Sequence, residues 1–469
     1  MSAAGERASE LGSPWREWIR QAEDPGRVSE KPEALDDLLV LDCSVGHYGG
    51  HVLAGFLGEL GAEVVKLEPP DGDPARAWGP ADATAGGEGL AFLAEGRNRA
   101  YATLDLTEPE GQALLRRLAA RADVLIEGFP PGRMDGWGIG YRQLQPLNPR
   151  LVYVALSTHG QFGPRAPQAG PEYDLIDQAL SGLAFLTGEP GDDRPPEAGA
   201  DARRPKAVPN GPEAERATAG MNSAVPTRVG SWISAYAQAG WAGMATLAAL
   251  HWRDQPGGTG QLIDVSGAEA LMRYLEYTLL LYHTGREVRQ RLGVYDLAVS
   301  VYTFVPVKDG WAFIAGYTDP NFGAICRIMG RPELTQDPRF RTTLDRTKPE
   351  NRAALRDEIA RWSVNHTTSE ILARVLADPG PGVVVFGPVN RPTQTLTEAH
   401  WWERACFSRV DDPIYGPLLL AMPAWRMTRT PPRLKVPGRP AGHHNGHVYA
   451  KYFGFGPERL AELKSRGII

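Results

Sequence analysis

The chain has 469 residues, of which 42% are hydrophobic and 23% charged, and its formal net charge is -6 at pH 7. This composition is typical of a globular protein and excludes the disordered and fibrous classes, and the negative charge argues against binding to nucleic acid. Because the length exceeds the size at which one core stops growing, we expect two domains.

The cysteines predict neither a disulfide framework nor a metal site. Cys43, Cys326 and Cys406 lie far apart in the sequence, which suits a reducing compartment. His47 and His51 lack the Glu of an HExxH pattern, so we expect no metal. The N-terminus lacks the order of a signal peptide, and no stretch reaches about 18 apolar residues. We therefore expect a cytoplasmic protein with no membrane partner.

The first half of the chain predicts an α/β fold. A polar extension precedes an apolar run over 38–42, a glycine-rich turn over 46–50, a helical stretch that Gly61 closes, and a second apolar run over 63–68. This order of strand, turn, helix and strand is a βαβ unit, which builds a parallel sheet. The theme continues with strands predicted over 102–106, 124–126, 151–156 and 262–265.

The second half predicts a smaller α+β domain. Residues 190–227, rich in Pro, Gly, Asp and Arg, indicate an insertion, and helices are expected over 231–252, 267–283, 352–376 and 457–466. Apolar runs on both sides of Lys308-Asp309-Gly310 predict a hairpin. The expected organisation is an N-terminal extension 1–37, a large domain 38–265 with the insertion, linker helices 266–300, a small domain 301–395, and a return to the large domain with the C-terminal helix, 396–469.

Two short segments are candidates for chemistry. The glycine-rich turn can present backbone N–H groups to a phosphate or a pantetheine chain, which makes His47 and Tyr48 candidate ligand contacts. The turn has neither the GxGxxG nor the P-loop pattern, and a structural tight turn explains it equally well. The carboxylates of Pro171-Glu172-Tyr173-Asp174 precede a helix, where capping is the usual role and catalysis the alternative.

A series of segments resembles one enzyme family in order and spacing. The first is LVLDCSVGHYGGHVLAGFLGELGAEVVKLEPPDGDPARAWGP, and later ones include LNPRLVYVALSTHGQFGP, GGTGQLIDVS, VKDGWAFIAG and the closing GHHNGHVYAKYFGFGPERLAELKSRGII. Together they resemble the class III CoA-transferases, of the CaiB/BaiF and formyl-CoA transferase type. The resemblance extends from Leu38 to the C-terminus.

The resemblance implies a class III fold, with a large Rossmann-like domain, a smaller α+β domain and an interlocked dimer, and it implies coenzyme A or acyl-CoA as substrate with no metal. Where family members often place Arg, Asn and Arg, this chain has Pro69, Gly128 and Gly136. Each change removes a hydrogen-bond donor, worth about 1–3 kcal/mol. Carried over by position, the CoA contacts fall at Pro69, Leu104, Asp105, Leu106, Thr107, Gly128, Phe129 and Tyr173.

The family nucleophile is missing from its expected position. In the family an Asp carboxylate attacks the donor thioester, forms a mixed anhydride and then carries CoA as an aspartyl thioester to the acceptor acid. Aligning Leu247-Ala248-Ala249-Leu250 and Gly258-Thr259-Gly260-Gln261 with the family places this Asp at Ala235. The racemase chemistry of the family fails too, because Tyr173 replaces the His before Asp174 and no acid–base pair remains.

Three functions stay open. In the first, the chain is the non-nucleophilic subunit of a heterodimer or heterotetramer, resembling one partner in benzylsuccinate CoA-transferase, and a homologous subunit supplies Asp. In the second, it is a homodimer that uses another carboxylate, such as Asp174 or Asp201. In the third, it is an acyl-CoA-binding scaffold without turnover. We favour the first, because the nucleophile and the CoA-contact donors are lost together. The expected partners are an acyl-CoA, a carboxylic acid and a homologous or identical subunit. Trp232 permits a bulky or aromatic acyl group, although a core position is the commoner role of Trp.

Overall fold

The computed structural model describes residues 13–81, 87–168, 173–190, 226–285 and 288–469. They belong to two compact units. The smaller unit is built around Gly285–Ala399, and the larger one contains Trp18–Ala184, Arg228–Thr284 and His400–Ile469. In the part of the chain that the structure describes, no helix is long and apolar enough to cross a bilayer.

A six-stranded parallel sheet forms the centre of the larger unit, in the order β3-β2-β1-β4-β5-β6. The parallel sheet predicted from the sequence is thereby confirmed. Its strands are β1 (Leu39–Cys43), β2 (Glu63–Glu68), β3 (Arg99–Thr103), β4 (Val124–Glu127), β5 (Val152–Ser157) and β6 (Leu262–Ser266).

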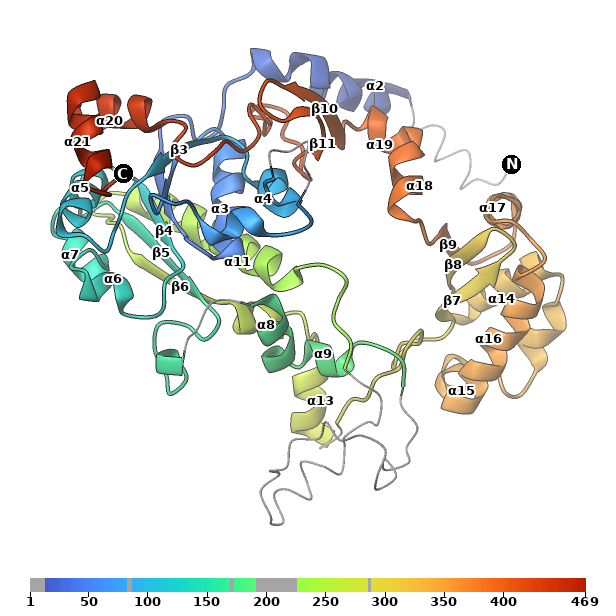
Figure 1. Cartoon of the computed structure of the whole chain (residues 1–469). Coiled ribbons are helices and arrows are strands. Elements are labelled where there is room, and N and C mark those ends of the chain that lie inside the picture. The colour runs from blue at the N-terminus through green and yellow to red at the C-terminus, as the bar shows by residue number, and fades with distance from the viewer. Residues whose placement is uncertain (1–12, 82–86, 169–172, 191–225, 286–287) are drawn as a thin grey trace, which may run out of the picture. The chain divides into compact units, whose positions relative to one another are not determined.

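Helices cover both faces of this sheet (Figure 1). On one face α3 (Tyr48–Glu59) and α11 (Ile233–Arg253) pack on a core that includes Val40 and Val154. On the other face α5 (Pro109–Ala119), α20 (Asn445–Phe453) and α21 (Pro457–Ser465) pack on a core that includes Leu41. Every residue of β1 is buried, as expected for a strand covered on both sides. This burial explains why the run from which the strand was predicted is apolar except for Asp42.

The sheet has a topological switch point between β1 and β4. From β1 the chain adds β2 and β3 on one side, and then continues with β4, β5 and β6 on the other. The connections that leave the carboxyl ends of β1 and β4 therefore diverge and open a crevice, the usual ligand position in an open α/β sheet. The β1–α3 turn and the segment that begins at Gly128 border this crevice.

Strand β3 lies three residues earlier than the predicted strand over 102–106. It pairs with β2 from Arg99 to Thr103. The pairing ends there because Asp105 N donates to Ile468 O at 2.8 Å rather than to the sheet. The segment after Thr103 thus becomes a loop at the carboxyl edge of the sheet.

Two helices predicted as continuous are each broken in two. The first becomes α12 (Gly267–Met272) and α13 (Thr278–Gly285), and Glu276 between them has a φ of 48°. The second becomes α16 (Pro349–Ser363) and α17 (Thr368–Ala377), because Thr367 starts a new helix with a capping box to Glu370. Such a box satisfies two backbone N–H groups at once and favours a helix start at this point.

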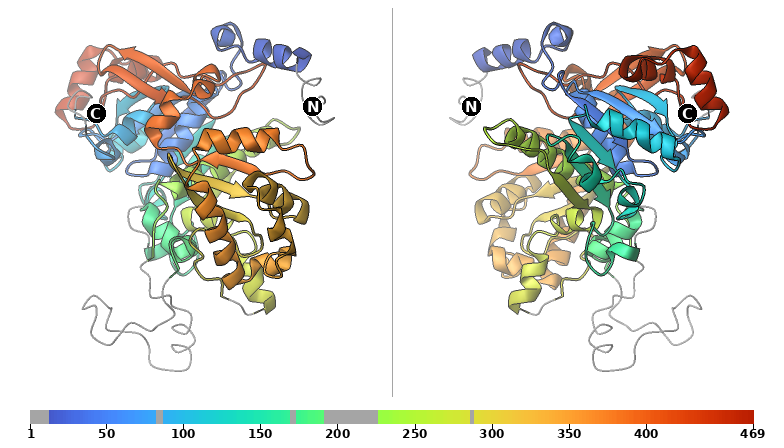
Figure 2. Two further views of the ribbon diagram at one scale, coloured as in Figure 1. Left: turned by 90° about the vertical axis from the view of Figure 1, so that its right-hand side faces the viewer. Right: turned by 90° about the vertical axis from the view of Figure 1, so that its left-hand side faces the viewer.

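The smaller unit contains a three-stranded antiparallel sheet, in the order β7-β8-β9. Strands β7 (Tyr302–Val307) and β8 (Gly310–Ala315) form the predicted hairpin, and β9 (Val385–Pro388) pairs with β8. Helices α14 (Asp319–Met329), α16 and α17 accompany the strands, drawn in yellow and orange in Figure 2. The unit has its own hydrophobic core, which includes Phe322, Ile325 and Ile359.

Buried charges lie under the carboxyl edge of the large sheet. Lys66 on β2 has no exposed side-chain surface, and its Nζ lies 2.8 Å from Asp73 Oδ2 and 3.6 Å from Asp42 Oδ1. Burial opposes the ammonium charge, but the carboxylates of Asp42 and Asp73 raise the pKa of Lys66 above its ordinary value. Asp73 Oδ1 also accepts hydrogen bonds from Gly46 N and Ala75 N, both at 2.8 Å. One side chain thus joins the β2 loop to the β1–α3 turn.

We expect Asp73→Ala to destabilise the protein by about 3–5 kcal/mol, because it leaves the Lys66 charge buried without its closest carboxylate. Urea unfolding followed by circular dichroism measures the loss. Glu30→Ala is the matched control, since it breaks the exposed pair between Arg27 and Glu30 and should change the stability far less. Equal losses in the two variants would contradict a structural role for the buried pair.

Glu127, the last residue of β4, predicts a pH dependence of stability. Burial raises the pKa of its carboxyl to about 8, against about 4.3 for an unperturbed Glu. Between these two values the folded chain holds a proton that the unfolded chain releases, so stability should fall as pH rises through this window. Glu127→Gln has no titrating group at this position, so this pH-dependent part of the stability is absent. Its amide oxygen can still accept the hydrogen bond that Phe129 N donates to the carboxylate at 2.7 Å.

Urea unfolding of both proteins at pH 5 and pH 8.5 tests this expectation. The Gln variant should gain stability relative to the parent chain as the pH rises. A constant difference between the two proteins over this range would show that the Glu127 carboxyl titrates normally.

Candidate functional site

The β1–α3 turn carries the first two predicted contacts. His47 is the N-cap of α3, and its Nδ1 accepts a hydrogen bond from Gly50 N at 3.1 Å. Gly46 has a φ of +65°, which an L side chain rarely adopts, and its N–H is held by Asp73. Tyr48 begins the helix and donates to Ala91 O at 3.1 Å. The turn is therefore fixed by its own bonds, with His47 in a capping role.

A cavity of about 270 Å³ lies at the carboxyl ends of β2, β3 and β4, and we call it the strand-end cavity. It brings together six of the ten predicted CoA contacts, which come from three separate loops. They are Pro69, Leu104, Asp105, Leu106, Thr107 and Phe129, and the remaining lining residues are Val45, Leu67, Pro70, Asp71 and Trp137.

The strand-end cavity is largely apolar. Its Asp105 carboxylate accepts bonds from Thr107 N at 2.8 Å and from Thr107 Oγ1 at 2.6 Å, so this acid shapes its own loop. No Arg or Lys occurs among the described residues that line it. Arg133 lines another cavity, and Trp137 lines both that cavity and the strand-end cavity. An anionic group bound here would therefore depend on Arg133 and on backbone N–H groups.

A second cavity, of about 160 Å³, contains the position expected for the nucleophile, and we call it the aromatic cavity. Ala235 lies in the first turn of α11 and is 2% exposed. Four other residues considered from the sequence lie in the same cavity: Tyr48, Tyr173, Asp174 and Trp232. Its complete lining is Tyr48, Trp78, Tyr173, Asp174, Trp232 and Ala235.

Asp174 is the first residue of α8 (Asp174–Ser181) and is engaged through both carboxylate oxygens. Oδ1 accepts from Ser234 N at 2.7 Å, and Oδ2 accepts from Gln178 Nε2 at 2.5 Å. The carboxylate therefore caps the start of α11 and ties α8 to it. The sequence predicted capping of the helix that follows this segment, but α8 has Tyr173 as its N-cap without a side-chain cap bond, and the Asp174 carboxylate bonds to the start of α11 instead. Asp201, the other alternative acid, lies outside the described residues.

Gly128 is packed against His47. A Cβ added at position 128 would lie 2.4 Å from His47 Cβ and 2.5 Å from His47 Cγ, which is closer than side chains approach one another. No residue with a side chain fits here while His47 keeps its position. The loss of the family's Asn at this position is thus linked to the way in which His47 caps α3.

Sequence reasoning missed two aromatic residues, Trp78 and Trp137. Trp78 lines the aromatic cavity, and Trp137 lies in T-shaped contact with Phe129 at a centroid distance of 5.2 Å. Each residue follows the end of a sheet strand by about ten residues, in a loop at the carboxyl edge. That position is a weak local signal, and the contact of Trp78 with Trp232 joins segments that are distant in sequence.

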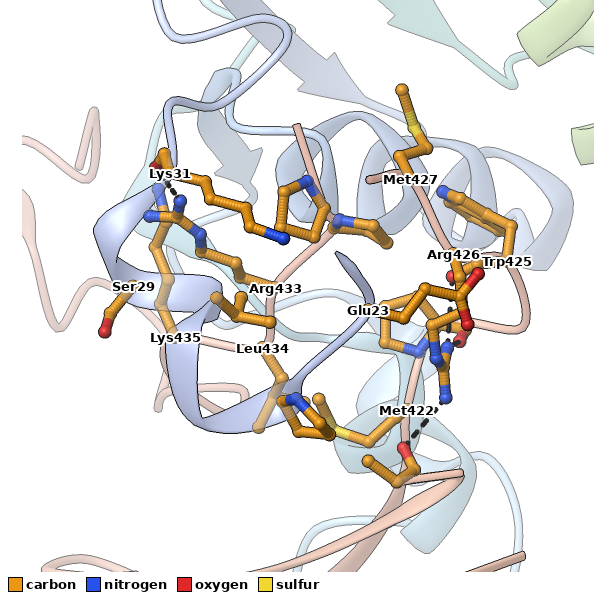
Figure 3. A pocket seen from close by; sticks show the side chains of 16 residues that line it. Glu23, Ser29, Lys31, Met422, Trp425, Arg426, Met427, Arg433, Leu434 and Lys435 are labelled. Carbon is orange, nitrogen blue, oxygen red and sulfur yellow. Dashed lines mark hydrogen bonds between the residues drawn. The ribbon is translucent and has the colours of Figure 1, made fainter. Parts of the chain in front are cut away.

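Another cavity of the larger unit, of about 480 Å³, contains none of the predicted residues (Figure 3). The 3-10 helix Pro25–Glu30 and the segment 422–435 form its walls. Its cations stabilise the chain itself: Lys435 pairs with Glu33 at 2.7 Å, Arg426 donates to Pro423 O at 2.6 Å, and Arg433 donates to Lys31 O. We therefore assign this cavity a structural role in docking the N-terminal segment.

His51, considered above as a metal ligand, has a structural environment. Its Nε2 lies 3.2 Å from Phe92 O, and its Nδ1 lies 2.7 Å from Arg99 Nη1. Burial, reinforced by the Arg99 charge, lowers the pKa of His51, so the ring is neutral. Within the described ranges no three His, Cys, Asp or Glu side chains are grouped as a metal site.

Comparison with known proteins agrees with this arrangement. The chain is 32% identical over 443 residues to succinyl-CoA–D-citramalate CoA-transferase of Chloroflexus aurantiacus, an alignment that covers 93% of this chain and 98% of the relative. It is 32% identical over 446 residues to the alpha subunit of succinyl-CoA–L-malate CoA-transferase of the same species, with 93% and 92% covered. The crystal structure of a CAIB/BAIF family protein from Brucella suis matches with a TM-score of 0.72 at 26% identity, over 90% of this chain and all of that one.

The sequence model of one family matches residues 35–445, which is most of the chain. The resemblance inferred from the sequence is thereby confirmed, and with it the class III fold and the assignment as a transferase enzyme that acts on CoA thioesters. The chain belongs to CoA-transferase family III.

Proposed function

We propose that the chain moves CoA between an acyl-CoA thioester and a carboxylic acid as the non-nucleophilic subunit of a heteromer. The observation that carries the proposal is the methyl side chain of Ala235 in the aromatic cavity, at the position where the family resemblance expects an attacking carboxylate. A methyl group has no lone pair for attack on a thioester. A homologous subunit with Asp at this position would form the mixed anhydride and the aspartyl thioester.

The heteromer is supported by the relative that is named as an alpha subunit, since that name implies a second, different chain. The principal alternative, a homodimer in which Asp174 attacks, is less well supported. Asp174 already accepts hydrogen bonds from Ser234 N and Gln178 Nε2, and such bonds lower the nucleophilicity of a carboxylate. An acyl-CoA-binding scaffold without turnover remains the second alternative.

In this proposal CoA lies along the crevice at the switch point. The strand-end cavity would hold the adenine and phosphate end, and His47, Tyr48, Gly128 and Tyr173 would follow the pantetheine chain toward the aromatic cavity. The turn that contains Val45 and Tyr48 borders both cavities, which supports one continuous path. We place the reaction in the cytoplasm, with an acyl-CoA and a carboxylic acid as substrates and no metal.

The first prediction concerns the purified chain alone. It should bind CoA but should not exchange CoA between a thioester and a labelled acid, and co-expression with a homologous chain that carries Asp at the position equivalent to Ala235 should restore exchange. Liquid chromatography of the labelled thioester measures the reaction. Exchange by the single chain that disappears in Asp174→Asn would favour the homodimer instead. If the chain binds CoA but exchanges none, either alone or when co-expressed with the homologous chain, the acyl-CoA-binding scaffold is the remaining function.

The second prediction restores the missing group. In Ala235→Asp, incubation with an acyl-CoA should give a covalent acyl or CoA adduct that intact-mass spectrometry detects and hydroxylamine removes. Ala235→Asn is the matched control, because it has the same size but no attacking oxygen, and it should give no adduct. If both variants fold and bind CoA but neither forms an adduct, position 235 is not the nucleophile position.

A further inference from the structure

The walls of the aromatic cavity indicate which acyl group it accepts. We propose that this cavity binds the acyl part of an aromatic carboxylic acid, or of a similarly compact apolar one, and discriminates against dicarboxylic acids. The inference rests on the proposed function, since it assumes that a CoA thioester extends its acyl group into this cavity. Three features of the cavity support it: the geometry of the rings, the charge of the lining and the volume.

The rings are arranged for edge-to-face contact. The Tyr48 and Trp232 centroids lie 4.6 Å apart with an interplanar angle of 80°, and those of Trp78 and Trp232 lie 6.2 Å apart at 73°. Tyr48 is held in place by its hydrogen bond to Ala91 O. Aromatic rings prefer this T-shaped arrangement because the positive edge of one faces the negative face of another. A flat acyl group entering between these walls would find the same kind of contact.

The charge of the lining opposes a second carboxylate. None of the six described lining residues is Arg, Lys or His, and the ionisable carboxyl is that of Asp174. A dicarboxylic acyl group would bring a second anion next to Asp174, and the described lining residues supply no cation to neutralise it. Burying an unpaired charge is strongly unfavourable. The dicarboxylic acids in the names of the two Chloroflexus relatives therefore do not suit this cavity.

The volume suits one ring. A cavity of about 150 Å³ with an apolar lining is large enough to hold benzene, and the aromatic cavity measures about 160 Å³. Ala235 contributes to this space because its methyl group is smaller than any carboxylate side chain. Longer acyl groups would have to extend past Tyr173, which is 59% exposed.

Isothermal titration calorimetry on the full-length chain tests the proposal, with CoA, phenylacetyl-CoA and succinyl-CoA as probes. Phenylacetyl-CoA should bind at least about tenfold more tightly than succinyl-CoA. Trp78→Arg should reduce or reverse this preference, because it removes one aromatic wall and supplies a cation for the second carboxylate. A gain in succinyl-CoA affinity cannot result from misfolding. Trp252→Ala is the matched control, since this Trp is exposed near the end of α11, outside the cavity lining.

The outcomes separate this inference from the proposed function. If neither CoA nor either thioester binds, the proposed function fails and the inference fails with it. If CoA binds but succinyl-CoA binds as tightly as phenylacetyl-CoA, the inference is overturned while the CoA site stands. An unchanged preference in Trp78→Arg would also overturn it, because the selectivity would then originate outside the aromatic cavity.

Discussion

The buried salt bridge between Lys66 and Asp73 is the interaction on which both cavities depend. Lys66 is on β2 and Asp73 is in the loop that follows, but the second carboxylate oxygen of Asp73 holds Gly46 N in the β1–α3 turn. That turn places Val45 at the strand-end cavity and Tyr48 at the aromatic cavity. Because the interior strengthens electrostatic attraction, this pair fixes the crevice far more firmly than exposed loop contacts would.

Close packing at the switch point explains why position 128 carries a glycine. His47 caps α3 and lies against Gly128, so the side chain that family members often have at position 128 has no room here. In the proposed CoA site, the strand-end cavity would consequently bind through shape and backbone groups, with Arg133 as the nearby cation. Affinity for CoA would then come mainly from apolar contacts, such as those of Phe129 and Trp137, rather than from charge.

Sequence alone predicted the features that are encoded locally. The strand Leu39–Cys43 is buried on both faces, so its sequence is apolar except for Asp42, whose carboxylate pairs with Lys66. Six of the positions carried over from the family meet in one cavity because they follow parallel strands of one sheet. The end of β3 was misplaced because it depends on a bond from Asp105 to Ile468, near the far end of the chain. Trp78 was missed for the same reason, since its cavity is completed by residues about 150 positions away.

The start of α11 retains the electrostatic environment of an attacking carboxylate even though Ala235 supplies none. The first turn of a helix carries unpaired N–H groups and the positive end of the helix dipole, which stabilise an anion. In this chain Asp174 provides that anion, through its bond to Ser234 N. The Asp174 carboxylate, at the start of α8, thus accepts a hydrogen bond from a backbone N–H group in the first turn of α11. An aspartate at position 235 would sit beside this acid, and repulsion between the two carboxylates would raise the pKa of the pair. In the proposed non-nucleophilic subunit, the methyl group at position 235 avoids this repulsion at the start of α11.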